Sequence, residues 1–150
     1  MRTLGTLSRK GGSGKTTRAV HRAVLAREAG QRTLLVDLDP QRSTAKWWRG
    51  RTAETPLLAE SDPPKLREVL AAAEAEGVDL AVIDTRPSAA EDAALVAAVS
   101  DVVLIPTQPA IFYLRAILST IDTAKGAIRR SMIVLNRCQA PRGAGEATET

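Results

Sequence analysis

A run of glycines and lysines near the N-terminus limits most strongly what this chain can fold into. Residues 9–17 read Arg-Lys-Gly-Gly-Ser-Gly-Lys-Thr-Thr, and they follow a short apolar run at 4–7. Apolar residues at helical spacing begin near Lys15. Glycines allow a tight turn that aims backbone N–H groups at anionic oxygens, and the start of a helix also attracts anions. The run therefore predicts a phosphate-binding loop between a strand and a helix.

The residues of this loop have separate predicted tasks. Lys15 would place its charge on the outer phosphates, and the Thr16 hydroxyl would ligate Mg²⁺. The usual pattern begins with glycine, whereas this chain has Arg9 followed by Lys10 and so carries a second lysine at the front of the loop. Spacing alone leaves Lys10 open to a local phosphate contact. A glycine-rich turn with incidental lysines is the alternative, which the flanking strand and helix pattern disfavours. The predicted nucleotide-binding residues are Gly11, Gly12, Ser13, Gly14, Lys15, Thr16 and Thr17.

Length and composition indicate one domain that stays in the cytoplasm. The chain has 150 residues, 44% of them apolar, and no stretch of eighteen apolar residues, so we expect no membrane segment. The single cysteine, Cys138, cannot form an internal disulfide bond. A net charge of +4 suggests an anionic partner. Nucleotide phosphates, non-specific DNA or merely a solvated basic surface would each account for it.

Apolar runs alternate with helical patterns along the chain, which predicts an α/β fold. We expect an open parallel sheet of about five strands with helices on both faces. The expected strands span 2–8, 33–36, 79–84, 102–105 and 132–135, and the expected helices span 15–29, 43–48, 64–76, 89–99 and 111–124. Residues 50–64 read as a polar connection. The predicted domain covers residues 1–137, and 138–150 form a polar tail or truncation point.

Three aspartates stand where predicted strands end. Asp37 and Asp39 are two residues apart, so on an extended chain they project to the same side, close to the phosphate site. Asp84 ends an apolar run, where a carboxylate could hold Mg²⁺ through a water. Capping of a helix or turn is the structural alternative for Asp84.

Taken together, these motifs resemble the ParA/MinD superfamily of deviant Walker A ATPases. The resemblance rests on Lys-Gly-Gly-x-Gly-Lys-Thr at 10–16, on Asp-x-Asp-Pro-Gln at 37–41 and on Asp-Thr-Arg-Pro-Ser at 84–88. It implies a P-loop NTPase fold of the SIMIBI type over roughly 2–137, most similar to small plasmid or chromosome partitioning proteins. Arg86 replaces a proline of the family pattern, and Tyr113 stands where the family often has aspartate. We expect the C-terminal strands and helices of relatives to be lacking.

The resemblance also implies roles for individual residues, with ATP and Mg²⁺ as cofactors. Lys10 would reach the phosphates of a partner subunit's ATP across a nucleotide-sandwiched dimer. Asp39 would orient the attacking water, and Asp37 would lie near the metal. Asn136 would contact adenine. The catalytic set is then Lys10, Lys15 and Asp39, and the metal set is Thr16, Asp37 and Asp84.

The expected function is a slow, Mg²⁺-dependent ATPase for plasmid or chromosome segregation. It would form an ATP-dependent homodimer, bind non-specific DNA on the nucleoid and engage a ParB-like centromere-binding protein. Arg129, Arg130, Arg137 and Arg142 are candidate DNA contacts, with a solvated basic end as the alternative. One cysteine cannot hold an iron–sulfur cluster. The alternatives are an ATP-dependent amidoligase or small-molecule kinase on the same scaffold, and a truncated, non-catalytic nucleotide-binding remnant.

Overall fold

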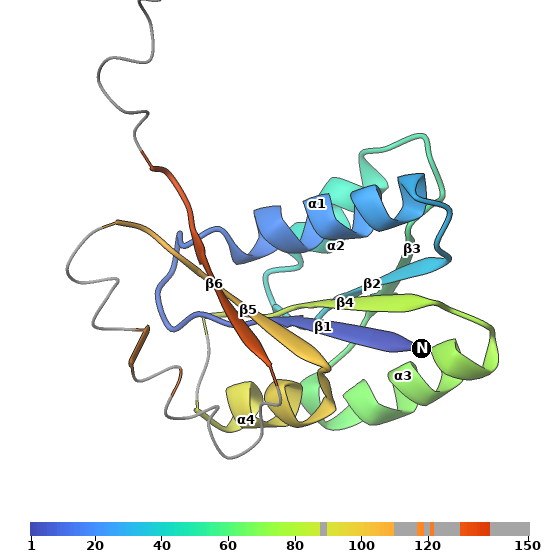
Figure 1. Ribbon diagram of the computed structural model, residues 1–150. Coiled ribbons are helices and arrows are strands. Elements are labelled where there is room, and N and C mark those ends of the chain that lie inside the picture. The colour runs from blue at the N-terminus through green and yellow to red at the C-terminus, as the bar shows by residue number, and fades with distance from the viewer. Residues whose placement is uncertain (88–89, 110–116, 119–120, 122–129, 139–150) are drawn as a thin grey trace, which may run out of the picture.

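A computed structural model of the protein describes residues 1–87, 90–109, 117–118, 121 and 130–138, which form one parallel sheet with helices on both faces (Figure 1). The strands are β1 (Arg2–Thr6), β2 (Thr33–Asp37), β3 (Leu57–Glu60), β4 (Leu80–Asp84), β5 (Val102–Thr107) and β6 (Ser131–Leu135). The helices are α1 (Lys15–Glu28), α2 (Ser43–Arg49), α3 (Leu66–Ala75), which follows a 3-10 turn at Pro63–Lys65, and α4 (Ala90–Val99).

The strand order places the end of β1 at the centre of the sheet. The order is β3-β2-β4-β1-β5-β6, and every neighbouring pair is parallel. The chain first builds the sheet on the β2 side of β1 and then crosses to the β5 side. Ligands of open α/β sheets bind beyond the carboxyl ends of the strands at such a point of reversal. The loop that follows β1 therefore lies at the expected place for a binding site.

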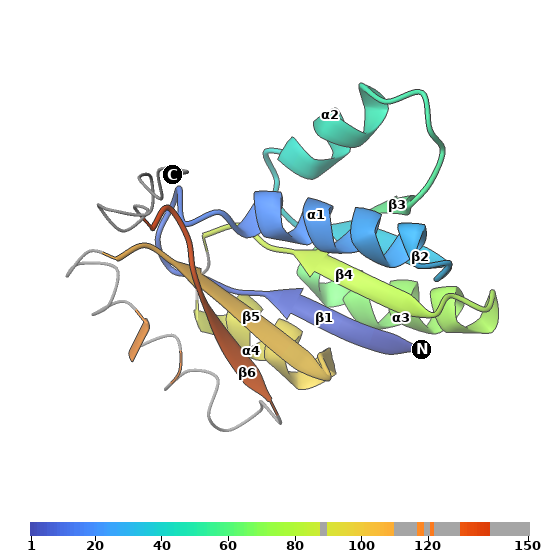
Figure 2. The same ribbon diagram turned by 45° about the horizontal axis from the view of Figure 1, so that its top comes forward.

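Apolar residues alternate between two buried layers because the sheet is covered on both faces. Leu35 and Val82 pack under α1 with Ala19, Val20 and Ala23. Their neighbours Val36 and Ile83 belong to the larger cluster on the opposite face, which includes residues of α3 and α4. Figure 2 shows α2 beside α1, on the same side of the sheet.

The predicted fold class is confirmed, with one strand more than expected. Residues 50–64, expected to be a connection, contain β3, which pairs with β2 at the edge of the sheet. The expectation was wrong there because the run Leu57–Leu58–Ala59 is short and lies between prolines, which normally mark loops. The expected helix at 111–124 falls almost entirely outside the described residues, as does the tail at 139–150. Among the helices that the structure describes, none is long and apolar enough to cross a membrane.

Gly5 lets β1 approach the end of α4 closely. A Cβ atom at Gly5 would lie 2.6 Å from Ser100 Oγ and 2.8 Å from Val96 Cγ1. Both distances are shorter than atoms tolerate, and Ser100 is held because its hydroxyl donates to the Val96 carbonyl at 2.7 Å. The strand that leads into the phosphate-binding loop is thus packed against α4 without a side chain between them.

We expect Gly5→Ala to lower the free energy of unfolding by about 1–3 kcal/mol, because it overpacks this contact. Urea denaturation measures the change. Gly50→Ala is the matched control, since Gly50 ends α2 at φ −76° and an added Cβ would meet its nearest atom, Trp47 O, at 3.5 Å. The control should be neutral or stabilise by up to about 1 kcal/mol. Equal stability of the Gly5→Ala variant and the wild type would contradict the close packing.

Candidate functional site

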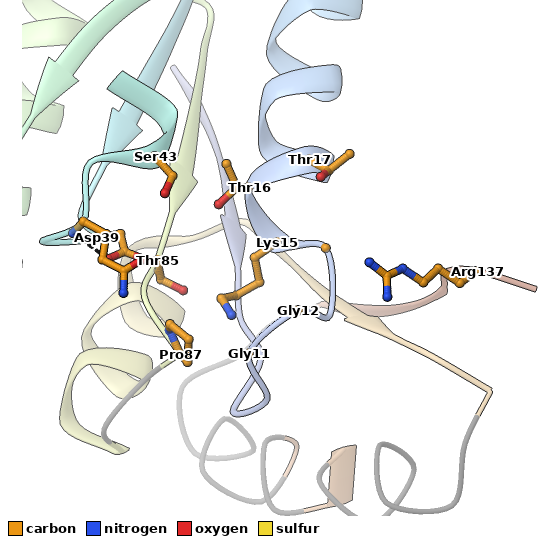
Figure 3. Close-up of a pocket in the computed structure, with 12 residues that line it drawn as sticks. Gly11, Gly12, Lys15, Thr16, Thr17, Asp39, Ser43, Thr85, Pro87 and Arg137 are labelled. Atoms are coloured by element: carbon orange, nitrogen blue, oxygen red, sulfur yellow. Dashed lines mark hydrogen bonds between the residues drawn. The ribbon is translucent and has the colours of Figure 1, made fainter. Parts of the chain in front are cut away.

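A cavity of about 410 Å³ lies beyond the carboxyl ends of the central strands. Figure 3 shows Lys15 and Thr16 in its middle, with Asp39 and Thr85 on one side and Arg137 on the other. The lining combines four segments that are distant in sequence and consists of Gly11, Gly12, Gly14, Lys15, Thr16, Thr17, Asp39, Gln41, Ser43, Thr85, Pro87 and Arg137. The structure therefore brings together most of the loop residues predicted from the sequence.

The glycine-rich loop adopts backbone angles that require glycine. Gly12 and Gly14 have φ of 71° and 98°, in the left-handed region that side chains disfavour. Gly14 is also the N-cap of α1, so the loop delivers the open N–H groups of that helix to the cavity. Ser13 is buried inside the loop and does not line the cavity. The predicted cradle thus forms with the helix start at its base.

Lys15 is buried, and its environment is prepared for an anion. Burial lowers the pKa of Lys15, while the charges of Asp84 and Asp39 partly oppose this shift. The ammonium group lies 3.5 Å from the Lys10 carbonyl, to which it donates a long hydrogen bond. A phosphate in the cavity would place a negative charge beside the Lys15 ammonium group and so stabilise its charged form. Lys15 therefore fits its predicted role.

Asp84 ends β4 beside the cradle and is completely buried. One carboxylate oxygen, Oδ2, accepts hydrogen bonds from Thr16 Oγ1 at 2.7 Å and from Thr44 Oγ1 at 2.6 Å. Burial raises the pKa of Asp84, the two threonine hydrogen bonds oppose the shift, and the neighbouring Asp37 reinforces it. The hydroxyl donors carry no formal charge, so they do not neutralise this carboxylate when it is ionised.

Thr16 and Asp84 fit a magnesium site of the kind that nucleotides complete. The Thr16 hydroxyl gives its one hydrogen to Asp84, so its lone pairs remain available on the cavity side. Magnesium usually takes one or two protein oxygens and completes its shell with phosphates and water. No group of three or more His, Cys, Asp or Glu side chains that could hold a metal occurs among the described residues. The donor set therefore suits Mg²⁺ with phosphate rather than a protein-only metal cage.

Asp37 serves the loop rather than the cavity. Its carboxylate accepts from the backbone N–H of Asp39 at 3.0 Å and from that of Ala45 at 2.9 Å. The side chain is fully buried and does not line the cavity, and this burial raises the pKa of Asp37 against the two backbone hydrogen bonds. These contacts give Asp37 a structural task that links β2 to α2, and the place near the metal that the resemblance implies for it stays a prediction.

Asp39 lies at the cavity wall on a loop that is held at both ends. Its Oδ1 atom accepts from the Gln41 N–H at 2.9 Å. Arg42 adopts a left-handed backbone conformation with φ of 52°, and its Nη1 atom donates to the carbonyls of Asp37 at 2.7 Å and Ser61 at 3.0 Å. This clamp ties the Asp39 loop to the ends of β2 and β3. The sequence contained no signal for it, because the contacts depend on β3.

Lys10 and Asn136 behave differently from the cradle residues. Lys10 is exposed and does not line the cavity. Asn136, the predicted adenine contact, donates from Nδ2 to the Ser13 carbonyl at 3.2 Å and accepts at Oδ1 from Arg18 Nη2 at 3.2 Å. It braces the cradle from the end of β6. Gln108, which the sequence analysis missed, does the same by donating to the Gly12 carbonyl at 2.9 Å.

Replacement of the buried carboxylate should make stability depend less on pH. Because the pKa of Asp84 is raised in the folded protein, the charged form destabilises the fold at pH values above that pKa and not near pH ~4. Asp84→Asn keeps an oxygen acceptor for both threonines and removes the charge. We expect its free energy of unfolding to exceed that of the wild type at pH 8 and to converge with it only as the pH falls to ~4 and below.

Urea titrations at several pH values measure this difference in the absence of nucleotide. Glu54→Gln, at an exposed position, is the control and should follow the wild type at every pH. A lower stability of Asp84→Asn at pH 8 would show that the hydrogen bonds to the charged carboxylate outweigh its burial.

Sequence comparison places this site in a known group of proteins. Residues 4–148 match the CobQ/CobB/MinD/ParA nucleotide binding domain. Over 152 residues the chain is 43% identical to Maintenance of carboxysome distribution protein A from Gloeobacter kilaueensis. The alignment covers 99% of this chain and 68% of that relative.

Solved structures share the same fold. A plasmid partition protein from Borrelia burgdorferi superimposes with a TM-score of 0.73 at 17% identity, over 92% of this chain and 79% of the other. Cobyrinic acid a,c-diamide synthase from Mycobacterium smegmatis, with bound ADP and magnesium, gives a TM-score of 0.72 at 18% identity, over 90% and 74% of the two chains. Since the family match extends across almost the whole sequence and the structure forms the expected phosphate cradle, the chain belongs to the CobQ/CobB/MinD/ParA family of nucleotide-binding domains.

Proposed function

We propose that the protein is a Mg²⁺-dependent ATPase of the ParA type that switches between monomer and dimer. The observation that carries the proposal is the convergence of Lys15, Thr16 and Asp39 on one cavity, with Asp84 bonded to Thr16 beside it. These groups match the needs of phosphoryl transfer, which depends on positioning and on charge stabilisation. Family membership supports ATP as the nucleotide.

In this mechanism each group of the cavity has one task. The cradle at 11–17 holds the phosphates through backbone N–H groups, and Lys15 neutralises charge on the outer phosphates. Thr16 and Asp84 would hold Mg²⁺, Thr16 through its hydroxyl oxygen and Asp84 by orienting that hydroxyl. When bound, the metal would supply positive charge that stabilises the phosphates. Asp39 orients a water for attack, and its hydrogen bond to the Gln41 N–H keeps the carboxylate at the cavity wall.

Lys10 acts in the dimer in this proposal. Its exposure at the mouth of the cradle leaves its side chain available to a second subunit. A cation that reaches the phosphates of a partner would stabilise charge in the manner of an arginine finger supplied in trans. Dimer formation would then require nucleotide, which makes the assembly a switch.

We further propose that the switch positions a cargo on DNA. The relatives named for carboxysome distribution and plasmid partition support this assignment. Non-specific DNA and a ParB-like, centromere-binding partner are the proposed contacts, and the protein would then associate with the nucleoid. Of the arginines named as DNA contacts, Arg130 and Arg137 are exposed, while Arg129 and Arg142 lie outside the described residues.

A ligase or kinase acting on a small molecule is the second candidate, favoured by the structural likeness to the diamide synthase. The two functions differ in what stimulates ATP turnover. Stimulation by DNA together with a partner protein supports partitioning, whereas dependence on a small carboxylic acid supports the ligase. Absence of ATP binding with Mg²⁺ in calorimetry would instead support the non-catalytic remnant.

Asp39→Ala should retain ATP binding and lose hydrolysis, because Asp39 touches the proposed water position and not the cradle. Calorimetry with ATP and Mg²⁺ and a phosphate-release assay measure the two properties. Lys15→Ala is the control that should lose binding itself, since it removes the charge on the outer phosphates. Loss of binding in Asp39→Ala would show that this residue only supports the loop.

Lys10→Ala should leave nucleotide binding to the monomer nearly intact and prevent ATP-driven dimers. Light scattering with a non-hydrolysable ATP analogue and Mg²⁺ measures the assembly. Arg9→Ala is the matched control, because it removes the neighbouring exposed positive charge and should still dimerise. Unchanged dimer formation in Lys10→Ala would refute the action in trans.

A further inference from the structure

One hydrogen bond joins helix α2 to the aspartate of the metal site. Thr44, in the first turn of α2, donates from Oγ1 to Asp84 Oδ2 at 2.6 Å across forty residues of sequence. Both side chains are completely buried. Thr44 does not line the cavity, so it has no direct contact with a nucleotide there.

The acceptor atom is the one that Thr16 also uses. Thr16 Oγ1 donates to the same Oδ2 at 2.7 Å, and it is the residue placed at the metal. One oxygen of Asp84 therefore has a donor on the cradle side and a donor on the α2 side. Because both donors bond to the same atom, a shift of the carboxylate affects both hydrogen bonds.

The segment between Asp39 and Thr44 is short and well held. Arg42 clamps it to the ends of β2 and β3, and the Ala45 N–H donates to the Asp37 carboxylate at 2.9 Å. These contacts thus connect the loop that carries Asp39 with the first turn of α2. The Thr44 hydroxyl is the side-chain contact that connects this segment to Asp84.

We propose that Thr44 is a positioning residue that couples occupancy of the magnesium site to the Asp39 loop and α2. This inference rests on the proposed nucleotide function. The Thr44 hydroxyl holds Asp84 Oδ2 in line with Thr16, and it transmits any shift of that carboxylate to α2. Mutation of residues that orient the metal ligands without touching the metal commonly changes metal affinity by about 10–100-fold.

The chain carries its own reporter of this coupling. Its two tryptophans, Trp47 and Trp48, both lie in α2, one turn after Thr44. The Trp47 ring lies 4.7 Å from the Arg51 guanidinium, and Trp48 Nε1 donates to the Pro56 carbonyl at 2.6 Å. Tryptophan fluorescence consequently reports on the surroundings of α2, without any need for catalytic turnover.

Two substitutions separate the hydroxyl from the shape of the side chain. Thr44→Val keeps the branched shape and removes the donor, whereas Thr44→Ser keeps the donor and removes a methyl group. We expect the valine variant to bind ADP in EDTA with an affinity within about twofold of the wild type. The increase in ADP affinity on addition of Mg²⁺ should be about tenfold smaller in this variant than in the wild type. The Mg²⁺-induced change in tryptophan fluorescence of the ADP complex should be lost as well. The serine variant should retain both properties.

The measurements are calorimetry with ADP across a Mg²⁺ series, tryptophan emission under the same conditions, and thermal unfolding as a check on folding. A wild-type response to Mg²⁺ in Thr44→Val would overturn the proposal. Should the valine variant fail to fold, the serine variant decides: a folded Thr44→Ser without the Mg²⁺ response means that the methyl group matters and refutes the hydroxyl role. Absence of Mg²⁺-dependent nucleotide binding by the wild type would instead refute the proposed function.

Discussion

The site depends on one buried carboxylate, that of Asp84, shared by two threonine hydroxyls. Burial disfavours its charge, as the raised pKa shows, and the hydrogen bonds from Thr16 and Thr44 offset part of this effect. Thr16 belongs to the cradle and Thr44 to α2, so the same atom joins two segments that are distant in sequence. The position of the proposed metal ligand therefore depends on the packing of β4 between β1 and β2.

Burial of charge is a general property of this end of the sheet. Lys15 has a lowered pKa and Asp37 and Asp84 have raised ones, in each case chiefly because the group is removed from water. The charged forms of such groups destabilise the free protein, and a bound ion of opposite charge stabilises them. A nucleotide with Mg²⁺ would supply both signs of charge in this cavity. Binding should consequently stabilise the fold, because a ligand that binds only the native state raises the free energy of unfolding.

Local patterns predicted most of the fold and most of the cradle. The glycine-rich loop, the apolar strands and the helix α1 follow from short-range signals, and the structure confirms them. Strand β3 escaped prediction because its few apolar residues lie at an edge between prolines, where only pairing with β2 reveals a strand. The contacts of Asn136 and Gln108 with the cradle escaped for a related reason, since they form only when β5 and β6 lie beside β1.

The sequence by itself determined the local parts of this site: a glycine-rich loop that carries two lysines, and aspartates at the ends of strands. These features are local, because turn geometry and strand ends depend on neighbouring residues. Only the tertiary structure decided which aspartate does what. Asp37 and Asp84 both end buried strands and lie side by side in the sheet. Asp37 nevertheless accepts from the backbone N–H of Ala45 in α2, whereas Asp84 accepts from the Thr16 hydroxyl. The difference arises because α1 follows the loop after β1, whereas α2 follows the loop after β2. Residue spacing along the chain does not indicate which helix begins next to which carboxylate.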